Sequence, residues 1–204
     1  LRSGPQFDEV PQIDGAYCKA HAAIETYGVL GYRDPTFQSL YKLRKKRDLI
    51  SDRLNLSLHA AHYLTADDIV PLLVLLLLET GLELECCKSL TLDCLRNAAG
   101  GTVDIAYTKL RAHGAEHKTL RVRDRGSSTP GGLIRRIIAL SSKARVHNSS
   151  DNLWVYFQPG EITAGIRQLR LRVSAWTQRH CITDDEGKPL HLCLSYLRKT
   201  HKAL

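Results

Sequence analysis

The sequence contains no methionine and no long run of apolar residues. Its most apolar stretch, residues 69–78, spans ten positions, about half of the roughly 20 that a transmembrane helix needs. No signal peptide precedes it. We therefore expect a buried core helix at this position and a cytoplasmic protein. Because the chain begins at Leu1 and lacks methionine, we also expect it to be a fragment or a processed chain.

The six cysteines form no C-x-x-C pair, which argues against a zinc ribbon and favours reduced, structural thiols. Among these, Cys86 and Cys87 adjoin an apolar segment, where buried free thiols are common. The pair His59-x-x-His62 has no further ligands at metal spacing and is interpreted as non-metal. Phosphate-binding loops, dinucleotide fingerprints and serine-hydrolase elbows are also missing from the sequence. We expect no metal and no cofactor.

Positive charge is concentrated in the second half of the chain. The formal net charge is +8. Residues 1–104 carry 11 basic and 14 acidic side chains, whereas residues 105–204 carry 18 and 7. Such local excess favours a surface that binds a polyanion, with DNA or RNA as the leading candidates. A generally basic surface without a nucleic-acid partner is the alternative.

The first 63 residues give weak structural signals. Proline, glycine and aspartate in residues 1–15 predict an extended lead-in, and helices are expected over residues 16–28 and 36–53. The second helix contains a basic stretch, residues 41–47, which could follow a DNA backbone or form a solvated helix face. We divide the chain into this lead-in, residues 1–63, and a main domain, residues 64–204.

A clear helix signal follows. Thr65 and Asp68 form an approximate capping box ahead of an apolar helix over residues 69–79, and Gly81 is a good C-terminal stop. Since proline is best tolerated in a first turn, Pro71 suggests a start slightly later, with Asp67 or Asp68 as the cap. A short helix should follow over residues 84–90.

The periodicity then changes from helical to alternating. Apolar residues alternate around 103–107 and 120–122, which predicts an antiparallel hairpin over about residues 102–123. Thr129-Pro130 predicts the start of a helix. Residues 146–165 are interpreted as loop-rich around an apolar run, followed by an amphipathic helix through Trp176 and a final helix from about Leu194. The order predicts a mainly helical α+β fold with a small antiparallel sheet.

Three segments together resemble the catalytic domain of tyrosine recombinases, the phage-integrase family, most closely those of actinobacterial type. Residues 64–82 resemble the opening of that domain, where an apolar helix leads to Thr-Gly-Leu-Arg. The strand Ile105-Ala-Tyr-Thr-Lys109 resembles the strand that carries a catalytic lysine. Ser195-Tyr-Leu-Arg198-Lys-Thr-His201 resembles the His-x-x-Arg-His-Thr box. The resemblance covers about residues 64–204 and implies the recombinase catalytic fold.

The resemblance implies strand cleavage and rejoining of double-stranded DNA at attachment-type sites through a 3′-phosphotyrosine, by a homotetramer. Arginine suits the phosphate because it binds two oxygens at once. Arg198 would be the second phosphate-clamping arginine, and Lys109 would be the general acid for the leaving 5′-oxygen, with Lys118 as the alternative. Ser195 stands at the usual histidine position. The DNA-binding candidates are Lys118, Arg121, Lys199, His201 and Lys202.

Two departures put catalysis in doubt. Glu83 stands where the family has its first arginine, a change of two charge units beside the phosphate. Each unit is worth on the order of 4 kcal/mol at 4 Å and an effective dielectric constant near 20, unless Lys88 or Arg96 compensates. The chain also ends six residues after Arg198, before the expected tyrosine, so the fragment should bind DNA weakly without cleaving it.

Two other interpretations stay open. One is a catalytically degenerate integrase-like protein that binds DNA, which Glu83 and Ser195 favour. The other is a basic regulatory or RNA-binding helical domain. The lysine-bearing hairpin followed much later by the arginine box argues against this last possibility.

Overall fold

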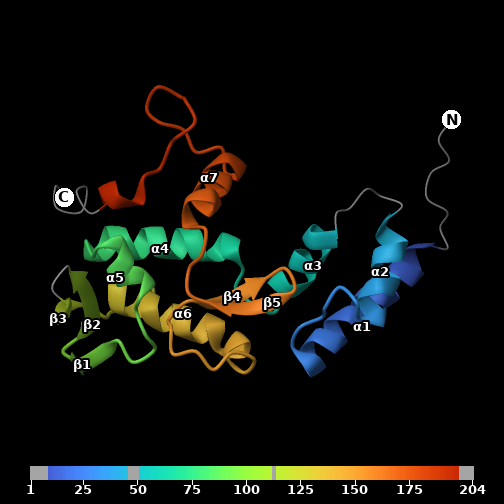
Figure 1. The fold of residues 1–204 in the computed structure, drawn as a ribbon, viewed down its shortest axis with the longest axis horizontal. Helices are drawn as coiled ribbons and strands as arrows, with labels where there is room; N and C mark the ends of the chain where they lie inside the picture. Colours follow the sequence, from blue (N-terminus) through green and yellow to red (C-terminus); the bar gives the residue numbers. More distant parts are fainter. Residues whose placement is uncertain (1–8, 46–50, 112–113, 198–204) are drawn as a thin grey trace.

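The computed structural model describes residues 9–45, 51–111 and 114–197. Arg198, Lys199, His201 and Lys202 lie outside the described residues. The first three helices, α1 (Glu9–Tyr27), α2 (Pro35–Lys45) and α3 (Ser51–Ala60), occupy one end of the molecule (Figure 1). The extended lead-in was wrong for residues 9–15, which are helical. Pro11 is the third residue of α1, where its missing N–H leaves no helical hydrogen bond unmade.

A single helix over residues 36–53 was also wrong. Helices α2 and α3 are separate elements that contact each other, and both also contact α1. Their buried side chains form one apolar cluster, which includes Ile24, Phe37, Leu40 and Leu58. A single straight helix could not bring its two halves into contact. The sequence signal was misleading because residues 44–48, Arg-Lys-Lys-Arg-Asp, include no glycine or proline that would mark a break between two helices.

The main helix α4 (Ala66–Thr80) begins where the capping box predicted. The Thr65 N–H donates to Asp68 Oδ2 at 2.8 Å, and the Thr65 hydroxyl donates to the same oxygen. The expectation of a later start was wrong, since Pro71 is the sixth residue of the helix. Gly81 ends α4 in the left-handed conformation, with φ of 62°, as predicted.

The predicted hairpin is confirmed and belongs to a larger sheet. Strands β2 (Thr102–Arg111) and β3 (Gly114–Arg123) pair antiparallel, and β1 (Leu95–Ala99), which the sequence analysis did not predict, pairs with the other edge of β2. Val103 and Ile105 are buried on the inner face of this sheet. Helix α5 (Leu84–Lys88) packs beside β2.

Helix α6 (Pro130–Arg145) starts at the predicted Thr129-Pro130 and packs against α4. The loop-rich interpretation of residues 146–165 was wrong, because β4 (Val155–Gln158) and β5 (Glu161–Ala164) form a hairpin. Its tight turn contains Gly160, with φ of 92°. Helix α7 (Leu169–Arg179) then packs against α4, and residues 194–197 are helical as expected.

Strand β4 lies between two apolar cores. Trp154 and Tyr156 belong to the larger core with α4, α5, α6 and the three-stranded sheet, whereas Val155 and Phe157 face the core of α1, α2 and α3. This alternation buries both faces of the strand. The Phe157 N–H also donates to Leu64 O at 2.7 Å. The N-terminal helices therefore pack on a strand of the later part of the chain, and the boundary at residue 63 stays a prediction.

The observed fold is α+β, with helices dominating over a three-stranded and a two-stranded antiparallel sheet. In the part of the chain that the structure describes, no helix combines the length and apolar character needed to cross a bilayer. None of the six cysteines forms a disulfide, and Cys86, Cys87 and Cys94 are buried. Burial raises the pKa of the Cys87 thiol to about 12, which makes it an inert packing group.

Candidate nucleic-acid interface

A tight turn between α4 and α5 places Glu83. The buried Thr80 hydroxyl donates to Leu76 O, and it accepts the Leu82 N–H at 3.3 Å. Gly81 donates its N–H to Leu77 O at 2.9 Å, which closes the end of α4. Glu83 follows in an extended conformation as the N-cap of α5. The segment resembling Thr-Gly-Leu-Arg therefore forms a hydrogen-bonded corner, with Glu83 at the start of α5.

The β2–β3 hairpin brings Lys109 to this corner. Alternate residues of β2 share a face, so Lys109 follows Val103, Ile105 and Tyr107 on the inner face of the sheet. The Lys109 Nζ lies 2.5 Å from Glu83 Oε1. Residues 26 positions apart are thus joined by an ion pair, and the sequence resemblance had assigned both of them to the same reaction centre.

The ion pair is partly shielded from water. The Lys109 side chain is 22% exposed and that of Glu83 is 36% exposed. On the partner strand, Glu116 lies directly across from Lys109, and Lys118 Nζ lies 3.0 Å from Glu116 Oε2. The positive charges of Lys109 and Lys118 are therefore each offset by a carboxylate, that of Glu83 or of Glu116. In this state neither Lys109 nor Lys118 presents an uncompensated charge.

The proposed compensation for Glu83 is not seen. Lys88 forms an ion pair with Glu85 at 2.8 Å, and Arg96 forms one with Asp93 at 3.0 Å. Within the described residues, the printed ion pair of Glu83 is with Lys109, the residue that the resemblance implies as general acid. The side chain at the arginine position of the family therefore binds the residue expected to protonate the leaving group.

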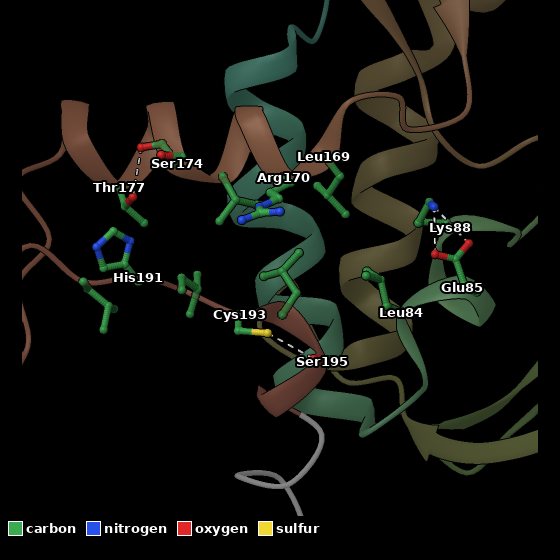
Figure 2. Close-up of a pocket in the computed structure, with 14 residues that line it drawn as sticks. Leu84, Glu85, Lys88, Leu169, Arg170, Ser174, Thr177, His191, Cys193 and Ser195 are labelled. Atoms are coloured by element: carbon green, nitrogen blue, oxygen red, sulfur yellow. Dashed lines mark hydrogen bonds and ion pairs between the residues drawn. The ribbon is translucent and has the colours of Figure 1, made fainter.

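Ser195 borders a surface cavity of about 810 Å³ between α5, α7 and residues 190–195. Figure 2 shows Leu84 on α5, Arg170 on α7, and Cys193 and Ser195 around this cavity. Glu83 directly precedes Leu84 in the chain, so the α5 corner and Ser195 belong to the same region. Ser195 is exposed, and its Oγ lies 3.1 Å from Cys193 Sγ.

Arg170 is a cation that the sequence analysis missed. It is exposed and borders the cavity, and among the described residues no carboxylate pairs with it. Its charge acts on Cys193, whose thiol pKa is lowered mainly by the hydrogen bond with Ser195 and also by Arg170. The closely spaced Arg167, Arg170 and Arg172 could have indicated a basic helix face. The sequence analysis used this segment only for its apolar residues, which predict an amphipathic helix.

Arg121 lies on the opposite face of the sheet from Lys109. Its guanidinium donates to Asp104 Oδ1 at 2.9 Å and to Asn97 O at 2.8 Å. His117, on the same outer face, lies 3.2 Å from the Thr108 hydroxyl. The structure therefore gathers Glu83, Lys109 and Lys118 on one face of the hairpin and separates Arg121 from them.

His59 has a structural position. It is fully buried, its ring stacks on Phe157 at 3.9 Å, and its Nδ1 contacts Asn55 O at 2.8 Å. Its Nε2 accepts the Leu30 N–H at 3.0 Å. Both ring nitrogens are occupied, and burial lowers the pKa of His59 to about 4. It is a neutral core residue that joins α3 to the segment before α2.

No family model, curated protein or solved structure matches this chain.

Proposed function

We propose that this chain is the DNA-binding catalytic domain of a site-specific tyrosine recombinase, acting within a longer protein whose nucleophilic tyrosine follows residue 204. The observation that carries the proposal is the 2.5 Å contact between Lys109 and Glu83. Each residue was selected from a separate motif, and the fold brings the two side chains together. The small antiparallel sheet beside α4 and α5 supports the recombinase fold.

The chemistry would proceed without a metal or cofactor. The tyrosine oxygen attacks the scissile phosphorus, the bond to the 5′-oxygen breaks, and a 3′-phosphotyrosine forms. Lys109 would protonate the leaving 5′-oxygen, and Arg198 would neutralise the non-bridging oxygens. Ser195, which is exposed beside the cavity, could donate a hydrogen bond to the same phosphate but is a poor base.

Double-stranded DNA is the proposed partner because the exposed Arg170 and the partly exposed Lys109 and Lys118 are suited to bind phosphate. Arg170 borders the cavity next to Ser195, and Lys109 and Lys118 lie at the hairpin near α5. The phosphate backbone would compete with Glu83 and Glu116 for the two lysines. Charge-assisted hydrogen bonds from arginine and lysine to phosphate are the usual source of such affinity. Assembly as a homotetramer on DNA is part of the same proposal.

Strand cleavage can be tested on the longer protein with a pool of random duplexes, each carrying a nick near its centre. We expect a covalent protein–DNA complex that survives denaturing detergent. Lys109→Ala should lose this complex but retain most of its DNA affinity. A substrate with sulfur in place of the bridging 5′-oxygen should restore cleavage, because a thiolate leaves without a proton.

Lys118→Ala is the matched control, since it removes the neighbouring lysine of the same sheet face. It should retain cleavage of the ordinary substrate. Full cleavage by Lys109→Ala would show that the hairpin assignment is wrong. Failure of the sulfur substrate to rescue Lys109→Ala would mean that the lysine acts in folding or binding.

The second candidate function is an integrase-like protein that binds DNA without cutting it. The ion pair that supports the first proposal also favours this one, because Glu83 neutralises the candidate acid and repels phosphate. The substitution Glu83→Arg distinguishes an active recombinase from a protein that only binds DNA. In a degenerate protein this substitution should strengthen DNA binding and yield no covalent complex.

A further inference from the structure

Two histidine contacts join α1 and the segment that follows it to α3, among the helices at one end of the molecule (Figure 1). The His21 Nδ1 on α1 shares a hydrogen bond of 2.9 Å with the Nε2 of His62, two residues after α3. The Leu30 N–H, three residues after α1, donates to the Nε2 of His59 on α3 at 3.0 Å. In each contact a ring nitrogen must lack a proton to accept the hydrogen bond. The attachment of α1 therefore depends on neutral imidazole.

The His59 ring has no place for a second proton. Because its Nε2 accepts the Leu30 N–H, its Nδ1 carries the ring proton and donates to Asn55 O at 2.8 Å. The ring is fully buried and stacks on Phe157 of β4, with centroids 3.9 Å apart. A proton on Nε2 would point at the Leu30 N–H, and neither group would then have an acceptor. Protonation of His59 is therefore incompatible with the packed position of Leu30.

The contact between His21 and His62 has the same requirement. One of the two facing nitrogens donates and the other accepts, so the contact holds one proton and not two. Both rings are partly buried, with centroids 5.1 Å apart. Burial lowers the pKa of His62, and the neighbouring His21 lowers it further. Acid therefore opposes this contact in the same direction as it opposes that of His59.

Charged groups of α1 and α6 act on the same pair. Lys143 on α6 adds a positive charge that lowers the pKa of His62, whereas the carboxylate of Glu25 on α1 raises it. The Tyr17 ring stacks on His21 with centroids 6.4 Å apart. The side of the pair that faces α6 is thus already positive before either histidine takes up a second proton.

A further histidine covers the end of α1 from the segment after α6. The His147 ring lies so close against Gly28 that no side chain would fit there. It also packs edge-on against Tyr63, with centroids 6.3 Å apart, and the Tyr63 hydroxyl donates to Gly28 O at 2.8 Å. A charge on His147 would therefore add to the repulsion at the same junction.

We propose that α1, with the segment through Leu30, is a pH-sensitive element that is released from the rest of the chain as these histidines take up protons. The larger core around α4 stays folded. The described part of α1 buries Ala20 and Ile24 in the smaller core, and an element with few buried apolar side chains opens before the rest. Among the described residues, the larger core contains no buried histidine.

The direction of the effect follows from the proton balance. Release exposes the Nε2 of His59 to water, where the pKa returns from about 4 to the ordinary value of 6.5. Between these values the released state binds more protons than the packed state, so the equilibrium moves towards release as the pH falls from 6.5 towards 4. Through His59 alone, lowering the pH from 7 to 5 should favour release by about 20-fold.

Hydrogen exchange followed by mass spectrometry measures the release, with rates corrected for the intrinsic pH dependence of amide exchange. From pH 7 to pH 5, the protection of α1 peptides should fall by about 20-fold or more, to a level well below that of α4 peptides. Tryptophan emission reports the larger core, because Trp154 belongs to it and Trp176 packs against it. That emission should be the same at pH 7 and pH 5.

Variants that cannot titrate test the role of the histidines. His59→Gln keeps an acceptor for the Leu30 N–H, and the protection of α1 should then change much less with pH. His62→Gln, at a partly buried position that tolerates substitution more readily, should also show a smaller fall than the unsubstituted chain. His191→Gln, at an exposed position outside this junction, should show the full fall.

Three results would overturn the proposal. One is protection of α1 that does not change between pH 7 and pH 5. Another is loss of α1 protection at the same pH as loss of α4 protection and native tryptophan emission, which would mean that the chain unfolds as one unit. The third is an unaltered pH profile in His62→Gln and in His59→Gln, or in His62→Gln alone if the other variant does not fold. Each measurement is independent of DNA binding.

Discussion

Lys109 Nζ and Glu83 Oε1 lie 2.5 Å apart, and this contact joins the β2–β3 hairpin to the first residue before α5. In the recombinase family that the sequence resembles, the equivalent of Glu83 is a cation. Here an anion occupies the position and pairs with the candidate acid. In the proposed recombinase, the DNA phosphate would take the place of the Glu83 carboxylate beside Lys109.

Removing the Glu83 charge should therefore strengthen DNA binding. Glu83→Gln leaves Lys109 free to contact phosphate and removes one repulsion, worth roughly 1 kcal/mol at 4 Å in water. We expect affinity for a 20-base-pair duplex to rise by about fivefold at low salt, since 1 kcal/mol corresponds to that ratio. The slope of log K against log salt should steepen by roughly one unit, because one more phosphate is neutralised. Fluorescence anisotropy measures both quantities.

Glu161→Gln provides the control for overall charge. It removes the same charge from an exposed position on β5, on a different sheet from Lys109. A gain equal to that of Glu83→Gln would mean that net charge alone governs affinity, and the hairpin would have no special part in binding.

Acid should destabilise the protein through His59. Burial lowers the pKa of His59 to about 4, below its ordinary value of 6.5. Between these values the unfolded chain holds more protons than the folded chain, so stability falls as pH falls from about 6.5 towards 4. Lowering the pH from 7 to 5 should reduce the free energy of unfolding by about 2 kcal/mol through protonation of His59 in the unfolded chain. Urea unfolding measures this reduction.

His59→Phe isolates this contribution. The variant should be less stable at neutral pH, since Leu30 N–H and Asn55 O lose their partner. Its free energy of unfolding should nevertheless change less between pH 7 and pH 5 than that of the unsubstituted protein. Equal pH dependence in the two proteins would assign the acid sensitivity to other groups.

Arg145 should be important for stability although no carboxylate binds it in the described structure. Its guanidinium donates to Ser150 O, Asn152 O and Leu153 O, which fixes the segment before β4 to the end of α6. Desolvation lowers its pKa. Arg145→Ala should cost about 2–3 kcal/mol, because charged hydrogen bonds to partly buried carbonyls are lost. Thermal unfolding, with the exposed Arg136→Ala as control, tests this.

The capping box at α4 gives a smaller, local effect. Asp68→Ala removes the acceptor of the Thr65 N–H and hydroxyl, and we expect a loss of about 1 kcal/mol in the free energy of unfolding. Glu79→Ala at the exposed far end of the same helix should change stability by a few tenths of a kcal/mol. Comparable losses in the two variants would argue against a specific role for the cap.

Helix α4 and the β2–β3 hairpin could be predicted from sequence because their signals are local. Thr65, Asp68 and Gly81 mark both ends of one apolar helix, and alternation around residues 103–107 and 120–122 marks the two strands of the hairpin. The proximity of Glu83 and Lys109 came from the family resemblance and not from any local pattern. It was the one non-local relation that the sequence supplied.

Other features depend on tertiary contacts that no local pattern encodes. The sequence of strand β4 is a continuous apolar run because each face of the strand is covered by a different core. It therefore lacks the alternation of apolar and polar residues that identifies a half-exposed strand. The pairing of Lys88 with Glu85 follows from helical spacing, yet it excludes the compensation considered for Glu83. The meeting of His21 and His62 depends on how α1 packs against α3.

The most direct test of the account is the salt dependence of duplex binding by this chain. Anisotropy titrations at 50 mM and 200 mM salt should show affinity falling by at least about tenfold, as expected when several phosphates are neutralised. Arg170→Ala should reduce that dependence, and Lys19→Ala on α1 should not. Binding that is unchanged between the two salt concentrations, or no binding at 50 mM, would contradict a phosphate-binding face formed by the hairpin, α5 and α7.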